Sequence, residues 1–299
     1  MHISRNPFAL VLVVAMASTT ALGQESFFVD AATLPSPGKV VVRQSAVYRS
    51  FGRDESGLGR RGYSVGGSTS VQVGLAPELS LTVDLPVAYR DYRQSPVVGA
   101  PAHDHSTGAA TAGAASPAVR ITDMTLDDFT VLGKWRVWRE DSGPLDTTRL
   151  AVLGGVELPS GSIDSSDSVD PVVGVALTAV RRRQGLNVAA TYKFSLGGRD
   201  YPLLAGGGNA DLLRVSASYL YRLSPEEFSA TRTTGLYAVL ESINTYETSG
   251  DTECLLAPGL MFEAPGFAVE MTVQLPVYQQ IRHRPQTDVA VGLGVRFTW

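Results

Sequence analysis

Cysteine is almost absent from this chain of 299 residues, which contains only Cys254. A single cysteine excludes a disulfide scaffold and a cysteine-rich zinc site. Charged residues are also few, at 18%, and the formal net charge of -4 favours neither a nucleic-acid-binding protein nor a disordered acidic chain. Lysine occurs only at Lys39, Lys134 and Lys193, so nearly all positive charge is arginine, which stays charged on burial and pairs bidentately with carboxylates. These side chains suit a polar interior, and nothing in the composition predicts a cofactor.

The chain also lacks an apolar run long enough for a membrane-spanning helix, which needs ~20 residues. The run from Phe8 to Ala17 is shorter, follows the basic Arg5, and precedes the small residues of Ala21-Leu22-Gly23. This pattern is typical of a signal peptide, so we predict export with cleavage near Gly23 and exclude residues 1–23 from the fold. An anchored N-terminal helix is the alternative. The mature chain could then reside in a membrane only by means of strands.

In place of long apolar runs, the sequence has residues that alternate with a period of two. Between residues 79 and 90, one face carries Leu79, Leu81, Val83, Leu85, Val87 and Tyr89, and the other carries Ser80, Thr82, Asp84, Pro86, Ala88 and Arg90. A transmembrane strand needs ~9–11 residues with this alternation. Residues 63–75 and 186–195 alternate in the same way. Weaker alternation predicts strands at about 40–51, 127–139, 148–158, 171–182, 211–223, 235–246, 254–263, 267–278 and 288–299.

The predicted fold class is therefore all-β: an antiparallel up-and-down transmembrane β-barrel of about 12 strands, within a range of roughly 10 to 14, formed by residues 40–299. Residues 24–39 would be a periplasmic leader or a plug inside the barrel. Two strands are the weakest predictions. In 235–246, Tyr237 and Glu241 share a face and break the alternation, and in 254–263, Pro258 would need a position near a bulge or rim.

The predicted connections alternate in length, as they do in barrels with short periplasmic turns and longer outer loops. The longer set is 52–62, 91–126, 159–170, 196–210, 247–253 and 279–287. The shorter set is 76–78, 140–147, 183–185 and 264–266, with 224–234 as its one long member. The alternation supports an up-and-down barrel and predicts which ends of the strands face outward.

The final predicted strand carries the most specific local feature. Its outward face includes Val295 and Phe297 and ends at the aromatic Trp299. This pattern resembles the C-terminal membrane-insertion signal of bacterial outer-membrane barrels, which implies the barrel-assembly machinery as a partner. An aromatic residue in the interfacial girdle is the simpler interpretation, and the two are compatible. The predicted location is the bacterial outer membrane, with its lipid bilayer as the surroundings.

Three stretches also resemble a known family. They are the turn and strand from Gly74 to Pro86, which end in Leu-Pro, the strand 127–136, and the stretch 154–161. Together they are similar to the outer-membrane transporter family named for the MetA-pathway of phenol degradation, whose members are exported barrels. The resemblance implies a transporter, although Ser160 stands where that family more often has Thr. Leu-Pro recurs at 158–159 and 275–276, near the predicted outer ends of strands, which indicates an architectural role for proline.

A barrel of about 12 strands lies between small filled barrels and wide porins, so we expect a narrow or gated lumen. The inward positions give these candidate lumen-lining residues: Arg43, Asp84, Arg90, Lys134, Arg136, Glu157, Lys193, Arg214, Glu270 and Arg296. The predicted inward set is richer in basic than in acidic side chains. One interpretation is a pore that favours anionic solutes. The other is a lattice of salt bridges that fills the barrel.

The predicted function is passive uptake or efflux of small molecules, which could be hydrophobic, aromatic or anionic, through an outer-membrane channel. The alternative is a non-conducting structural or adhesive barrel. An outer-membrane hydrolase is the third class, but the three histidines of the mature chain lie in predicted loops, and His283 is flanked by two arginines that disfavour a general base. His103 and His105, with Asp104 between them, make a poor metal site in an Ala/Gly-rich loop. We therefore predict no enzyme, no metal and no nucleic-acid partner.

Overall fold

The computed structural model describes residues 24–95, 118–143, 146–162, 165–198, 203, 205–206, 208–229 and 231–299. The predicted signal peptide, residues 1–23, and the loop with His103 and His105 lie outside the described residues. Within the described part of the chain, no helix is long and apolar enough to cross a membrane.

All regular elements in the described residues are strands, and they lie close to the predicted ranges. Their bounds are β1 (Val40–Asp54), β2 (Arg61–Ala76), β3 (Leu79–Gln94), β4 (Val119–Leu126), β5 (Phe129–Asp141), β6 (Thr147–Leu158), β7 (Asp170–Arg181), β8 (Gln184–Lys193), β9 (Leu212–Ser224), β10 (Gly235–Glu247), β11 (Thr252–Ala264), β12 (Phe267–Gln280) and β13 (Pro285–Thr298). Every pairing between them is antiparallel. The sheet closes because β1 pairs with both β2 and β13, and β2 also pairs with β3.

The thirteen strands fill twelve positions in the wall, because β4 and β5 are two halves of one broken strand. β4 pairs with the second half of β3, and β5 pairs with the first half. The break lies opposite Pro86, which has no N–H to donate to the ladder, and the Pro86 carbonyl instead accepts a hydrogen bond from the Asp127 N–H at 3.1 Å. The predicted antiparallel barrel of about 12 strands is confirmed.

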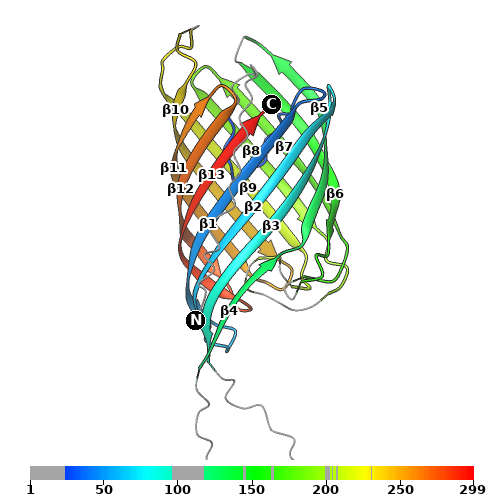
Figure 1. Cartoon of the computed structure of the whole chain (residues 1–299), viewed down its shortest axis with the longest axis vertical. Helices are drawn as coiled ribbons and strands as arrows, with labels where there is room; N and C mark the ends of the chain where they lie inside the picture. Colours follow the sequence, from blue (N-terminus) through cyan, green and yellow to red (C-terminus); the bar gives the residue numbers. More distant parts are fainter. Residues whose placement is uncertain are drawn as a thin grey trace, which may run out of the picture.

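Two details of the prediction are wrong. Residues 119–126 were expected within a long loop, but they form β4, which Figure 1 shows projecting past the end of the barrel. The local reason is an ion pair between strands: the Arg120 guanidinium bonds both carboxylate oxygens of Asp91 on β3.

Pro86 was expected near a strand end but lies within β3. Proline is accommodated there because the neighbouring strand is interrupted.

The outer wall of the barrel is apolar. Large side chains that alternate along the strands stay exposed on this surface, among them Leu81, Leu85, Val173, Val175, Leu186, Leu240, Leu260, Phe262, Met271, Val273, Leu275, Val291 and Leu293. Aromatic pairs lie near both ends of this belt, such as Tyr48 with Tyr63 and Phe297 with Trp299. An apolar belt of this extent with aromatic residues at its two edges fits a lipid bilayer and not water.

The two ends of the barrel differ in their connections. At one end, two-residue turns lie at 77–78, 182–183 and 265–266, and the C-terminus is beside them, at the top of Figure 1. We call this the turn end. At the other end, the connections include 95–118, 159–169 and 194–211, and we call it the loop end. The predicted alternation of short and long connections is thus present in the structure.

Candidate functional site

The N-terminal segment, residues 24–39, runs inside the barrel. Gln24, Glu25 and Ser26 are buried, as are Val29, Ala31 and Ala32. Residues 24–25 and 33–37 face the turn end, whereas Asp30 faces the loop end, so the segment enters the lumen, turns and returns to β1. Irregular backbone at this depth is tolerated only where the protein itself satisfies its polar groups.

Side chains of the wall supply those hydrogen bonds. The Ala32 N–H donates to Thr178 Oγ1 at 2.8 Å, and Lys134 Nζ donates to the Ala31 carbonyl at 2.7 Å. Asn187 Nδ2 donates to the Gln24 carbonyl at 3.1 Å, and Asn187 Oδ1 accepts from the Thr178 hydroxyl at 2.8 Å. These contacts link the segment to strands β5, β7 and β8. The inward polar residues of the barrel therefore act as partners for a specific length of chain.

Phe27 and Phe28 fit against the wall where the last strand presents glycine. A Cβ at Gly294 would lie 2.3 Å from Phe27 Cδ1, and a Cβ at Gly292 would lie 2.7 Å from Phe28 Cζ. Both glycines face the lumen, so the missing side chains create the space that the two rings occupy. Phe27 also packs against an apolar cluster of Leu220, Tyr237, Val239 and Met261.

This contact explains the broken alternation in β10. The lumen face of β10 carries Tyr237, Val239 and Glu241, which lie at alternate positions of the strand. The outward face carries Leu236 and Leu240. Apolar residues are stable on this part of the inner wall because Phe27 covers them. A second such patch lies across the lumen, where Val29 and Ala32 pack against Leu132, Ala151, Leu153, Ala176 and Ala189.

Two buried glutamates bind the backbone at the two phenylalanines. Glu270 Oε1 accepts from the Phe27 N–H at 3.5 Å, and Glu241 Oε1 accepts from the Phe28 N–H at 3.3 Å. Both carboxylates are fully buried, and neither forms an ion pair with a described residue. Their second oxygens have no hydrogen-bond partner. A buried carboxylate with one long hydrogen bond is costly, so this part of the contact holds the segment weakly.

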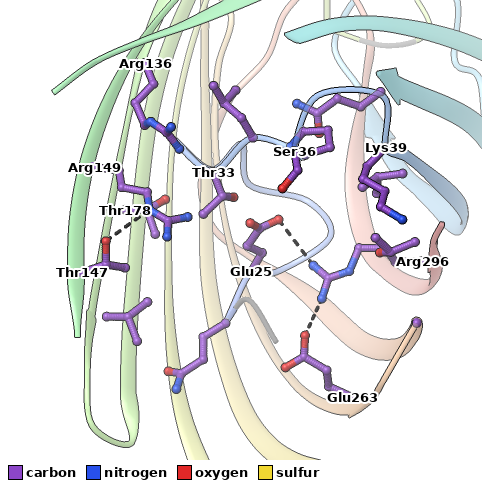
Figure 2. Close-up of a pocket in the computed structure, with 18 of the residues that line it drawn as sticks. Glu25, Thr33, Ser36, Lys39, Arg136, Thr147, Arg149, Thr178, Glu263 and Arg296 are labelled. Atoms are coloured by element: carbon purple, nitrogen blue, oxygen red, sulfur yellow. Dashed lines mark hydrogen bonds and ion pairs between the residues drawn. The ribbon is translucent and has the colours of Figure 1, made fainter. Parts of the chain in front are cut away.

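Two chambers lie on either side of the segment. The turn-end chamber has a volume of about 600 Å³ and is lined by residues 33–37, Glu25, Arg136, Arg149 and Arg296 among others, as Figure 2 shows. The loop-end chamber, of about 400 Å³, is lined by residues that include Asp30, Asp84, Glu157, Lys193 and Arg214. Residues 26–32 lie between the two chambers, so the segment is the barrier between the two ends of the lumen.

All ten predicted lumen residues lie on the inner wall or line a chamber. Arg43, Arg136 and Arg296 line the turn-end chamber, and Asp84, Arg90, Glu157, Lys193 and Arg214 line the loop-end chamber. Lys134 and Glu270 are buried at mid-height against the segment. The role of these side chains in transport stays a prediction.

Most of these charges form ion pairs. Lys193 Nζ lies 2.6 Å from Glu157, Arg90 Nη2 lies 2.9 Å from Asp127, and Arg136 Nε lies 2.8 Å from Glu78 in the turn between β2 and β3. The Arg136 hydrogen bond is also the main reason why the pKa of Glu78 is below its usual range. Arg214 has no ion pair with a described residue, and the same is true of Asp84.

Three carboxylates that the sequence reasoning missed complete the network. Glu25 on the segment bonds both Arg43 and Arg296, with the Arg296 contact at 3.4 Å. Arg296 also reaches Glu263 on β11 at 2.6 Å, and Glu253 on the same strand lies 3.7 Å from Arg49. The excess of basic charge is therefore smaller than the predicted set indicated. Alternate residues of β11 face the lumen, and this alternation could have identified Glu253 and Glu263. No sequence signal places Glu25 in the lumen.

At the loop end, Asp128 ties down the connection between β6 and β7. It lies between β4 and β5, outside both strands. Its carboxylate accepts from the Ser160 N–H at 2.9 Å and from the N–H and hydroxyl of Ser166 at 2.7 and 2.6 Å. Burial alone would raise the pKa of Asp128, but these hydrogen bonds outweigh it and hold the pKa below its usual value.

His283 is the one histidine among the described residues, and it lies in the connection between β12 and β13. Its Nδ1 is 3.0 Å from Asp251 Oδ1, and its backbone N–H also bonds Asp251. In the part of the chain that the structure describes, no group of three or more metal-ligating side chains is suited to a metal ion. The predictions of no catalysis and no metal remain predictions.

Comparison with known proteins addresses the fold. No family model and no curated protein match this chain. An outer membrane channel from Pseudomonas putida F1 has a similar structure, with a TM-score of 0.56 at 10% identity, and the match covers 92% of this chain and 100% of that one. The fold is that of an outer-membrane β-barrel. At this identity the likeness to the channel shows the fold alone.

Two other outer-membrane barrels are more distant. The β domain of the Bordetella autotransporter BrkA has a TM-score of 0.42 at 11% identity, with 89% of this chain and 100% of that chain covered. OccAB3 of Acinetobacter baumannii has a TM-score of 0.39 at 9% identity, with 87% and 98% covered. Because no family model matches, the resemblance to the family named for the phenol-degradation pathway remains a prediction.

Proposed function

We propose that this protein is a channel of the bacterial outer membrane through which small molecules pass passively, and that residues 24–39 are its plug. The observation that carries the proposal is the pair of chambers, about 600 and 400 Å³, that the segment separates. A barrel that only had to be stable could fill this space with side chains, as small barrels do. The likeness in fold to an outer membrane channel supports the same function.

In this proposal, the turn end faces the periplasm and the loop end faces outward, as in barrels with short periplasmic turns. Residues 1–23 are removed on export, the barrel-assembly machinery inserts the chain, and the aromatic C-terminal strand ending at Trp299 is its signal. The resemblance to the phenol-degradation family favours a hydrophobic or aromatic solute. Chambers lined by both charged and apolar side chains accept a solute with a polar group and an apolar body.

The segment contacts favour a plug that can leave the lumen. Among the described residues, the backbone of residues 24–36 is held to the wall by side chains and not by a strand ladder. The N–H groups of Phe27 and Phe28 bond glutamates at 3.5 and 3.3 Å, longer than the usual ~2.9–3.0 Å. Gly38 and Lys39 form backbone hydrogen bonds with Gly74 on β2, at 2.9 and 3.0 Å, so displacement of residues 24–36 leaves these bonds and the strand pairings of the wall intact. The plug can therefore move while the wall stays closed.

The test is single-channel conductance of the refolded mature chain in a planar bilayer, beside a variant that lacks residues 24–36. We expect brief openings from the full chain and steady, larger conductance from the shortened one. Heat-modifiable migration on a gel verifies that both variants are folded. A shortened barrel that is folded but silent would refute the channel.

A non-conducting structural barrel is the second candidate, and the buried packing of Val29 and Ala32 favours it. It predicts the same silence from both variants. The conductance experiment therefore decides between the two functions.

A further inference from the structure

The turn-end chamber is unusually rich in cations. Among the described residues that line it, the cationic side chains are Lys39, Arg43, Arg136, Arg139, Arg149 and Arg296, and the acidic ones are Glu25, Asp141 and Glu263. The loop-end chamber shows the opposite balance, with five acidic and three cationic lining residues. Positive charge is thus concentrated on one side of the plug.

Most cations of the turn-end chamber already have carboxylate partners. Arg43 and Arg296 share Glu25, and Arg296 also bonds Glu263, as the dashed lines in Figure 2 mark for Arg296. Arg139 pairs with Asp141, and Arg136 pairs with Glu78. These pairs fix the geometry of the chamber but leave little attraction for a solute.

Arg149 and Lys39 differ from the others. Neither forms an ion pair with a described residue. Among the described residues, the Arg149 guanidinium makes one hydrogen bond, from Nε to Thr147 Oγ1 at 3.1 Å, and its two terminal nitrogens have no partner there. In Figure 2 the side chain of Arg149 extends from the wall into the chamber, opposite Lys39 and with Thr33 and Ser36 between them.

A guanidinium with both terminal nitrogens unbonded is suited to a planar anion, because its two parallel N–H groups match the two oxygens of a carboxylate. The rest of the lining indicates which anion. Apolar side chains of Leu34, Val180 and Phe228 contribute to the wall, and a volume of about 600 Å³ is far larger than an inorganic ion needs. The chamber provides an anion contact at one side and apolar surface around it.

We propose that the turn-end chamber binds a small organic carboxylate with an apolar body, and that Arg149 is the residue that holds the carboxylate. The proposal deepens the channel function proposed above and rests on it, since the bound carboxylate is the transported solute. Lys39 adds a second positive charge at the turn-end mouth of the chamber. Glu25 and Asp141 stay paired with arginines and so do not repel the solute.

The experiment is calorimetric titration of the folded mature barrel in detergent with benzoate, at equilibrium and without any requirement for conduction. We expect Arg149→Gln to weaken benzoate binding at least tenfold, Arg149→Lys to weaken it less, and Lys39→Gln to weaken it modestly. Arg181→Gln is the matched control, because Arg181 lies on the outward face of β7 and bonds a threonine hydroxyl, Thr148 Oγ1, at 2.8 Å. This control should bind benzoate like the wild type.

Two further ligands complete the titration. Benzyl alcohol, which has the same ring without the charge, should bind at least tenfold more weakly than benzoate, and inorganic phosphate should not compete with benzoate at equal concentration. Wild-type benzoate affinity in folded Arg149→Gln would overturn the proposal, as would equal binding of benzyl alcohol or phosphate. If benzoate binding is absent while the barrel conducts, the carboxylate site fails and the channel function stands.

Discussion

Adding one methyl group beneath the plug should open the channel. In Gly294→Ala, the new Cβ would lie 2.3 Å from Phe27 Cδ1, 2.5 Å from Cγ and 3.0 Å from Cβ, so the ring cannot keep its place by a small rotation. Overpacking of this kind costs ~1–3 kcal/mol, and the cost falls only on the state with the plug in place. The ratio of open to plugged barrels should therefore rise by roughly 5- to 150-fold.

Open probability in a planar bilayer is the assay, with Gly66→Ala as the matched control. Gly66 lies on the lumen face of β2, but a Cβ there meets nothing within 4 Å. This control should conduct like the wild type. The effect of Gly294→Ala should also shrink when Phe27 is replaced by alanine, because the ring atoms at 2.3 and 2.5 Å are then absent and only the 3.0 Å contact with Cβ remains. Unchanged opening in a folded Gly294→Ala barrel would refute the assignment of residues 24–39 as the barrier.

Two more predictions test the plug and the loop end. In a Cys254→Ser background, cysteines introduced by Phe27→Cys and Gly294→Cys should form a disulfide. The Phe27 Cβ lies 3.0 Å from the position of a Cβ at residue 294, and a small movement of the segment would give the ~3.5–4.5 Å between Cβ atoms that a disulfide needs. The oxidised barrel should stay closed and reduction should restore openings; openings from the fully oxidised form would contradict a moving plug. The connection between β6 and β7 should loosen in acid, because the pKa of Asp128 is lower in the folded protein than in the unfolded chain. The Asp128 carboxylate therefore stabilises the connection fully above the unfolded pKa of ~3.9. This stabilisation is lost as the pH falls through the lower folded pKa. Pepsin should cleave this connection faster below about pH 4 in the wild type, whereas in Asp128→Ala cleavage should already be fast at about pH 4. Equal cleavage rates of the two proteins at about pH 4 would show that Asp128 does not anchor the connection.

Much of the wall could be predicted from the sequence, because a strand between lipid and a polar lumen must alternate in character. The alternation of apolar and polar residues from Leu79 to Arg90 predicted the strand β3. The same alternation correctly predicted that Arg90 faces the lumen and Leu85 faces outward. The alternation failed at residues 119–126, where β4 leaves the barrel and meets β3 alone. Among the described residues β4 has no neighbouring strand on its other edge, and its apolar residues Ile121 and Met124 fall on opposite faces, so its sequence carries no period-two signal. The ion pair of Arg120 with Asp91 that holds it joins residues distant in sequence.

The sequence by itself determined the barrel, the near-twelve strand count and the side of the wall on which each charge lies, because all of these follow from a local period of two. Only the tertiary structure decided what those charges do. Glu270 was expected to line a narrow or gated lumen, yet it bonds the backbone of Phe27, and Glu241 bonds that of Phe28. The contacts join residues more than 200 positions apart, and they form only because closing the barrel brings β10, β12 and β13 around a segment with no regular structure of its own. A local pattern carries no information about such a meeting, so the sequence left a plug and a periplasmic leader open as alternatives for residues 24–39 and could not predict the two chambers.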